Sequence, residues 1–153
     1  MSRIPLPTAG RLAVIAAIAF ALGSTVKADL NPKAINVSMP NEIKWTKGNG
    51  SEQAVLVGDP SKPGLYVVLQ KWLPHNNSRP HFHANDRYIT VLSGTWWVNT
   101  GAKYDPDGFK PVPAGSFVTH YAKEIHYDGA RDAECVLQIV GMGPATSMPA
   151  EQK

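Results

Sequence analysis

The feature that most restricts the fold of this chain is a series of short runs rich in Val, Ile, Thr, Tyr and Trp, separated by Gly, Pro, Asn, Asp and Ser. β-Branched and aromatic residues favour strands, and the residues between the runs favour turns. After residue 28 no segment shows the apolar repeat of an amphipathic helix. The runs predicted as strands are residues 42–46, 54–57, 65–72, 87–92, 95–99, 116–120 and 135–140. The sequence therefore predicts an all-β sandwich or barrel.

The first 28 residues have the pattern of a secretory signal peptide. Arg3 and Arg11 precede an apolar run of 11 residues, 12–22, and small residues follow it. Small or apolar residues, Val26 and Ala28, occupy the two positions that select a cleavage site, so we expect cleavage after Ala28 and a secreted or periplasmic protein. A retained anchor is the main alternative. The run is well short of the roughly 20 residues that a membrane-spanning helix needs, so no stable span is expected.

The charge of the chain argues against a nucleic-acid partner. The sequence has 15 basic and 12 acidic residues, but three of the basic ones (Arg3, Arg11 and Lys27) belong to the leader, which has no acid. Cleavage would leave twelve of each sign and no basic cluster. The only cysteine is Cys135, which excludes an intramolecular disulfide. Its apolar neighbours predict a buried, unreactive thiol.

Two histidines one residue apart stand just before the predicted strand 87–92. In an extended chain His81 and His83 point to the same face, where two neutral imidazoles can share one transition-metal ion. Ordinary hydrogen-bonded loop histidines are the alternative. The same alternation places Arg87 on the histidine side, unless a bulge around residues 85–86 changes the register.

A second segment, residues 112–129, carries two further histidines, His120 and His126. A catalytic metal site needs three protein ligands and an open position, and this segment can supply the third ligand.

The chain resembles a single-domain cupin. The first cupin motif, G-x5-H-x-H-x3–4-E-x6-G, is matched in spacing by His75, His81, His83, Arg87 and Gly94. The second motif, G-x5-P-x-G-x2-H-x3-N, is matched by Gly115, Tyr121, Lys123, His126 and Ala130. A Pro-Ala-Gly-x-Phe segment and a later His-Tyr are similar to the ChrR-like cupins, which are named for the cupin half of an anti-sigma factor.

This resemblance implies a fold and a domain organisation. The fold would be a double-stranded β-helix, a jelly-roll barrel, spanning residues 50–143. Residues 29–49 would form an N-terminal extension with the first strands, and residues 144–153 a C-terminal tail. Cupins are commonly dimers, so a homodimer through sheet edges is expected.

The resemblance also implies a ligand set. His81, His83 and His126 fall on the three histidine ligands of the family, whereas Arg87 replaces the glutamate ligand and cannot coordinate a metal. A neutral three-histidine site remains, as in zinc enzymes and the iron sites of cupin thiol dioxygenases, and it would take zinc, iron, nickel or copper. The motif does not select His120, which could be a fourth ligand, a base that hydrogen-bonds a ligand, or a surface residue.

Arg87 divides the functional hypotheses. If the Arg87 guanidinium points inward, its charge must be compensated, either by an acid such as Asp86, Glu124 or Asp128 or by an anionic substrate. A third alternative is that the site holds no metal and Arg87 stabilises the empty barrel. One hypothesis is an exported metalloenzyme, dioxygenase-type by preference, acting on a small anionic organic substrate that Arg87 binds. The other is a non-catalytic module that binds metal or a small ligand, for example in sensing. The fold alone does not choose between them.

Overall fold

The structure, a computed structural model, describes residues 30–153. The predicted signal peptide and the predicted cleavage site after Ala28 lie outside the described residues. The chain divides into two units, Met1–Val37 and Ser38–Lys153. In the first unit, the described residues form a turn in which the N–H groups of Ala34 and Ile35 donate to the carbonyl oxygen of Asn31. All the strands found in residues 30–153 belong to the second unit.

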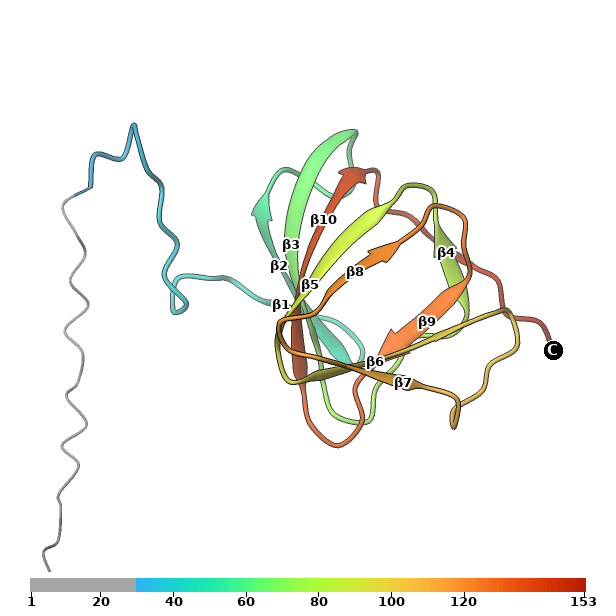
Figure 1. The fold of residues 1–153 in the computed structure, drawn as a ribbon. Coiled ribbons are helices and arrows are strands. Elements are labelled where there is room, and N and C mark those ends of the chain that lie inside the picture. The colour runs from blue at the N-terminus through green and yellow to red at the C-terminus, as the bar shows by residue number, and fades with distance from the viewer. Residues whose placement is uncertain (1–29) are drawn as a thin grey trace, which may run out of the picture. The chain divides into compact units, whose positions relative to one another are not determined.

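Eleven strands form within the described residues, and Figure 1 shows most of them. They are β1 (Thr46–Lys47), β2 (Ser51–Val57), β3 (Gly64–Trp72), β4 (His81–His83), β5 (Arg87–Ser93), β6 (Thr95–Thr100), β7 (Lys110–Pro113), β8 (Phe117–His120), β9 (His126–Gly129), β10 (Cys135–Gly143) and β11 (Ser147–Pro149). The all-β prediction is confirmed. Six of the predicted runs match a strand closely. The first prediction, 42–46, is wrong: it shares only Thr46 with β1, and residues 42–45 form no strand. The strands β4, β7, β9 and β11 are additional.

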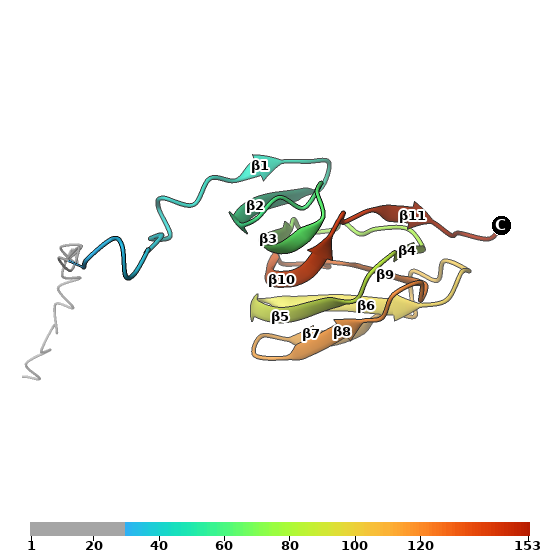
Figure 2. The same cartoon turned by 90° about the horizontal axis from the view of Figure 1, so that it is seen from above.

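The strands form two antiparallel sheets that pack face to face (Figure 2). One sheet has the order β1-β2-β3-β10-β5-β8, and the other has the order β11-β4-β9-β6-β7. Strands far apart in sequence are neighbours in both sheets, as in a jelly roll. The segment expected to be a C-terminal tail contains β11, which pairs with β4 along its whole length.

The strand β5 confirms the predicted alternation. Ile89 and Val91 are each 1% exposed, whereas Tyr88 and Leu92 are 46% and 48% exposed. Arg87 has the same parity as the two buried residues and lines the interior, as predicted. The extended register assumed between His83 and Arg87 does not hold, however, because a bend at residues 84–85 separates β4 from β5 and the two strands belong to different sheets. The inner residues of β3, β5, β6 and β10 form the hydrophobic core, which includes Trp96, Leu137 and Ile139.

Cys135 begins β10 in this core and is fully buried. Burial raises the pKa of its thiol to about 12, so the thiol stays protonated at neutral pH. The predicted burial of this cysteine is confirmed, and its lack of reactivity stays a prediction.

Two turns have a left-handed backbone at positions where the cupin motifs carry glycine and this sequence does not. His75 and Lys123 have φ values of 61° and 67°, in the left-handed region that favours glycine. Each turn is fixed by its own amide: the N–H of His75 donates to the carbonyl oxygen of Arg131 at 2.7 Å, and that of Lys123 donates to the carbonyl oxygen of His83 at 2.8 Å. The second contact ties the turn directly to the histidine strand β4.

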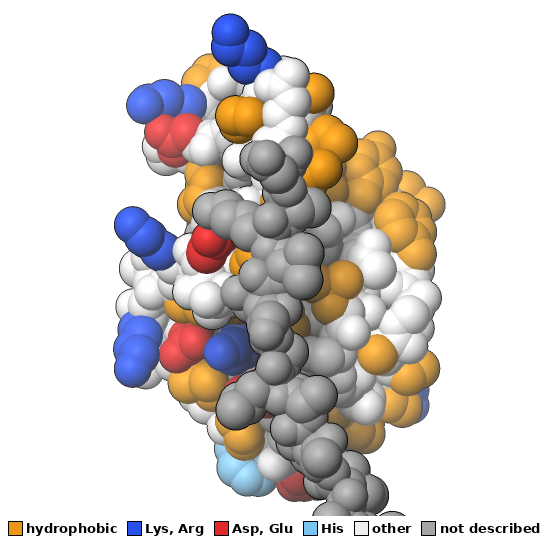
Figure 3. All heavy atoms as spheres, turned by 90° about the vertical axis from the view of Figure 1, so that its left-hand side faces the viewer, with side chains coloured by type: hydrophobic (Ala, Val, Ile, Leu, Met, Phe, Trp, Pro, Cys, Tyr) orange, Lys and Arg blue, Asp and Glu red, His pale blue; other side chains and the backbone are white. Residues whose placement is uncertain are grey.

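Basic and acidic side chains both contribute to the face of the molecule shown in Figure 3. On the face shown in Figure 3, basic and acidic side chains lie among one another on one side, and hydrophobic and uncharged side chains dominate the other. Large hydrophobic residues on the six-stranded sheet, including Leu65, Tyr88, Phe117 and Met142, are exposed. Residues 30–153 include no helix with the length and hydropathy needed to cross a bilayer.

Candidate metal centre

The three histidines of the cupin motifs come together on the five-stranded sheet. His81 and His83 lie on β4 and His126 begins β9, where it pairs directly with His81 across the two strands. Their ring centroids are 4.6 to 5.1 Å apart. One nitrogen atom from each ring can be chosen so that all three lie within 4.8 Å of one another, a spacing that one ion can bridge.

Each of these rings is held through its Nδ1 atom. The Nδ1 atoms of His81 and His83 lie 2.8 Å from the carbonyl oxygens of Arg79 and Thr146, and Nδ1 of His126 lies 3.0 Å from the carbonyl oxygen of Glu124. A carbonyl only accepts hydrogen bonds, so Nδ1 carries the proton and Nε2 carries the lone pair. This arrangement orients a histidine as a metal ligand.

The surroundings keep the rings of His83 and His126 neutral. Burial, followed by the charge of Arg87, lowers the pKa of His83 to about 3. Burial, followed by the neighbouring His81, lowers the pKa of His126 to about 4. The Nε2 atom of His126 is buried and has no hydrogen-bond partner within residues 30–153. A buried lone pair without a donor is costly, and a metal ion would satisfy it. These residues therefore fit a divalent transition metal.

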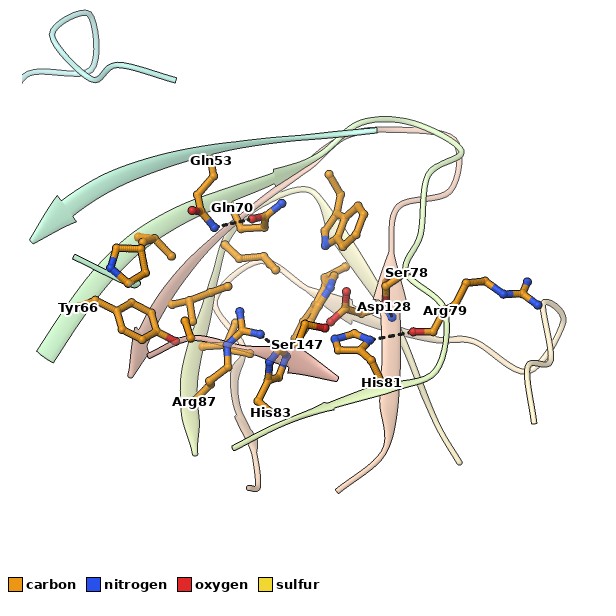
Figure 4. Close-up of a pocket in the computed structure, with 18 of the residues that line it drawn as sticks. Gln53, Tyr66, Gln70, Ser78, Arg79, His81, His83, Arg87, Asp128 and Ser147 are labelled. Carbon is orange, nitrogen blue, oxygen red and sulfur yellow. Dashed lines mark hydrogen bonds between the residues drawn. The ribbon is translucent and has the colours of Figure 1, made fainter. Parts of the chain in front are cut away.

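Arg87 points into the same cavity from the start of β5. Its Nη1 atom donates a hydrogen bond to Nε2 of His83, as Figure 4 shows. Its Nε atom is buried and has no partner in the described part of the chain. The residue that replaces the glutamate ligand of the family is thus a donor aimed at one of the candidate ligands.

His120 is not a surface residue. It ends β8 opposite Arg87, is buried, and has its ring centroid 3.7 Å from that of His126. Burial, followed by His126, lowers the pKa of His120 to about 2. Together with His126 and Asp128 it forms a second group whose ligand atoms lie within 4.8 Å of one another. Since Nδ1 of His126 is taken by a carbonyl, its Nε2 can serve only one of the two groups at a time.

The three acids that could compensate Arg87 have different positions. Asp86 accepts a hydrogen bond from the amide of Ala122 at 2.7 Å, and Glu124 has an exposed side chain. Asp128 is buried in the cavity wall beside His81 (Figure 4), and burial raises the pKa of its carboxyl group. Since Asp128 is two residues from His126 on β9, the alternation of a strand would have placed both on one face. Sequence reasoning named Asp128 but did not single it out.

The cavity has a volume of about 430 Å³, within the range of small-molecule sites. Its polar wall includes His81, His83, Arg87 and Asp128, together with Gln53 and Gln70, which hydrogen-bond each other at 3.2 Å. Its apolar wall includes Tyr66, Val68, Trp72, Ile89, Trp96, Leu137 and Ile139. The two glutamines and the carbonyl of Thr146 were missed from the sequence. No motif marks the glutamines, and a backbone carbonyl leaves no residue-type signal.

Comparisons with known proteins agree with this fold. No protein-family model matches the sequence, and no curated protein matches it. Among solved structures, the chain is similar to the polyketide cyclase RemF from Streptomyces resistomycificus, with a TM-score of 0.63 and 16% identity over 78% of this chain and 87% of that chain. A double-stranded β-helix protein from Klebsiella pneumoniae gives a TM-score of 0.58 and 16% identity over 77% and 99% of the two chains. A cupin-2 domain from Rhodospirillum rubrum gives 0.56 and 13% over 78% and 80%.

The fold and these similarities define a class: the chain has the cupin fold, a double-stranded β-helix. Within it, a cluster of three histidines, whose ligand atoms lie within 4.8 Å of one another, could bind a metal ion.

Proposed function

We propose that this protein is an exported metal-dependent cupin enzyme that acts on a small anionic organic substrate. The observation that carries the proposal is the orientation of His81, His83 and His126, whose Nδ1 atoms all face backbone carbonyls and whose ligand nitrogens can converge within 4.8 Å. A set of neutral imidazoles favours zinc, iron, nickel or copper over magnesium or calcium. When bound, such a metal would supply Lewis-acid or redox chemistry.

The other residues of the cavity would act on the substrate. The planar guanidinium of Arg87 has a buried Nε without a partner in residues 30–153, and it suits a carboxylate. Asp128 has a raised pKa because it is buried, and it could hold a proton beside His81 and transfer it to the substrate. The apolar wall around Val68 and Ile89 would exclude water from the bound substrate. His120, whose ring lies tilted against that of His126 with the centroids 3.7 Å apart, would fix the orientation of that ring.

Dioxygenase-type chemistry is the reaction class that we favour, since cupin thiol dioxygenases use a neutral three-histidine iron site. The similar fold of the polyketide cyclase RemF supports no particular reaction, because the identity is only 16% and one fold hosts many chemistries. Elemental analysis of protein recovered from the exported fraction tests the metal. We expect about one zinc, iron, nickel or copper ion per chain, and oxygen uptake by the iron-loaded protein would then separate oxygenases from Lewis-acid enzymes.

A non-catalytic module that binds a small ligand is the second candidate. The hydrogen bond from Arg87 to Nε2 of His83 favours it, because this contact occupies the lone pair of a candidate ligand. Protein exported without any transition metal, and unable to take one up, would support this candidate against the enzyme.

Export, subfamily and assembly belong to the same proposal. The leader pattern supports cleavage after Ala28, and mass spectrometry of the exported protein should give an N-terminus at Asp29. The Pro113-Ala114-Gly115 segment supports a relationship to the ChrR-like cupins. Exposed hydrophobic residues on the six-stranded sheet, such as Phe117 and Met142, support a homodimer, which light scattering after size-exclusion chromatography would detect.

A further inference from the structure

One lone pair in the cavity has two competing partners. The carbonyl oxygen of Thr146 fixes the proton of His83 on Nδ1, so Nε2 can only accept. Nη1 of Arg87 now donates to this Nε2 atom. A metal ion held by His81, His83 and His126 needs the same lone pair. Arg87 must therefore leave His83 before the third histidine can coordinate.

The charges of the cavity determine where Arg87 can go. In the described residues, the charged groups that line the cavity are Arg87, Asp128 and Arg79. Arg79 already pairs with Glu151, and His83, which accepts from Arg87, is neutral. A divalent ion and Arg87 together carry three positive charges, and an ionised Asp128 balances one of them, so two remain unbalanced. If Asp128 is protonated, all three remain unbalanced.

Such an excess in a buried site disfavours the metal unless an anion accompanies it. The displaced guanidinium offers its donors, including the buried Nε atom, to that anion. A carboxylate fits because it accepts two parallel N–H groups from an arginine. The anion would then balance the metal and Arg87 together.

We propose that Arg87 competes with the metal for His83, and that a carboxylate ligand relieves the competition by binding Arg87. Metal and carboxylate then bind with positive coupling, each tightening the other by the same factor. This inference rests on the proposed metal site and anionic substrate. It adds that Arg87, which stands where the cupin motif has glutamate, makes the metal affinity depend on the substrate.

The experiment titrates Zn²⁺ into metal-stripped protein against a chromogenic chelator, with and without millimolar benzoate. Benzamide, the neutral analogue, is the ligand control. For the wild-type protein we expect benzoate to tighten Zn²⁺ binding at least tenfold, and benzamide to have no effect. The Arg87→Met protein should bind Zn²⁺ at least tenfold tighter than wild type without any carboxylate, and benzoate should no longer matter. Arg79→Met is the matched control, since it also removes an arginine charge, but one that pairs with Glu151 and does not contact a histidine ring, and it should keep the benzoate effect.

Circular dichroism and thermal unfolding confirm that each variant is folded. Equal or weaker Zn²⁺ binding by Arg87→Met would overturn the competition while leaving the metal site in place. Tighter binding by Arg87→Met with no benzoate effect in wild type would overturn the coupling to a carboxylate. Zn²⁺ binding by the variant alone would support the competition and overturn the proposed metalloenzyme. Absence of Zn²⁺ from both proteins would overturn both proposals.

Discussion

The carbonyl oxygen of Thr146 accepts a hydrogen bond from Nδ1 of His83 at 2.8 Å, across 63 positions of the chain. Thr146 immediately precedes β11, whose residues Ser147 and Pro149 pair with His83 and His81. The C-terminal segment thus fixes the tautomer and the orientation of one candidate ligand. Partners of this kind are worth roughly 10–100-fold in metal affinity.

Removing residues 144–153 should therefore weaken the metal site without touching a ligand. We expect Zn²⁺ affinity to fall about 10–100-fold, because His83 loses its Nδ1 acceptor and β4 loses its partner strand. Chelator competition measures the change. A chain ending at Ala150 keeps β11 and the 2.9 Å bond from Ala150 to the carbonyl of Pro80, so it is the matched control. Equal affinities of the two truncated proteins, both folded by circular dichroism, would contradict the role of Thr146.

Single replacements should distinguish the two overlapping ligand groups. Changing His81, His83 or His126 to Ala should reduce the metal content sharply after dialysis, because two ligands hold an ion poorly against water. His120→Gln should retain about one ion per chain, since His120 is not part of the proposed set. Elemental analysis decides between the groups. Full metal in His81→Ala/His126→Ala would exclude the proposed centre, and loss of metal in His120→Gln with retention in His81→Ala would place the ion between His120, His126 and Asp128.

Lys123→Gly should stabilise the protein. A non-glycine residue in the left-handed region costs about 1–2 kcal/mol, and glycine would remove this cost. The greater freedom of glycine in the unfolded chain offsets about 0.5–1 kcal/mol of that stabilisation. The free energy of unfolding should rise by roughly 0.5–1 kcal/mol, which urea denaturation can measure. Lys123→Ala keeps the Cβ atom and the strained backbone, so it should leave stability nearly unchanged. A stabilisation by Ala as large as that by Gly would show that the lysine side chain, and not the backbone, is unfavourable.

The raised pKa of the Cys135 thiol should make the free energy of unfolding depend on pH. The pKa of Cys135 is raised from 9.0 to about 12 in the folded protein, so between these values the folded chain holds a proton that the unfolded chain has lost. This contribution to stability is complete below about pH 9 and disappears as the pH rises toward 12. We expect the free energy of unfolding of Cys135→Ala to fall less steeply above pH 9 than that of wild type. Parallel curves for the two proteins would contradict the raised pKa.

Apart from β1, the six-stranded sheet was predicted well from the sequence, and most of the five-stranded sheet was predicted poorly. The strands β2, β3, β5, β8 and β10 are rich in β-branched residues, and all were expected. Apart from β6, the five-stranded sheet consists of short strands without such a signal. β4 has the sequence HFH and β9 has HYDG, and β7 contains two prolines. Their pairing depends on the packing of the barrel rather than on their own propensities.

The candidate site divides in a similar way. Motif spacing identified His81, His83 and His126, and strand alternation placed Arg87 on the inner side. Alternation could not foresee that Nη1 of Arg87 would contact Nε2 of His83, because rotamers depend on the surrounding packing. The carbonyl of Thr146 could not be foreseen either, since hydrogen bonds to the backbone depend on the course of the chain.

The short histidine strand also determines how the barrel can open. Within residues 30–153, β4 is registered with β9 at one position only, but with β11 at three. The six-stranded sheet, by contrast, contains the long ladder between β3 and β10. Local fluctuations that detach β11 would therefore release β4 while the opposite sheet stays intact, and slow amide exchange should be confined to β3, β5 and β10. Such sub-global opening would give an ion a route to and from His83 and His126 without global unfolding.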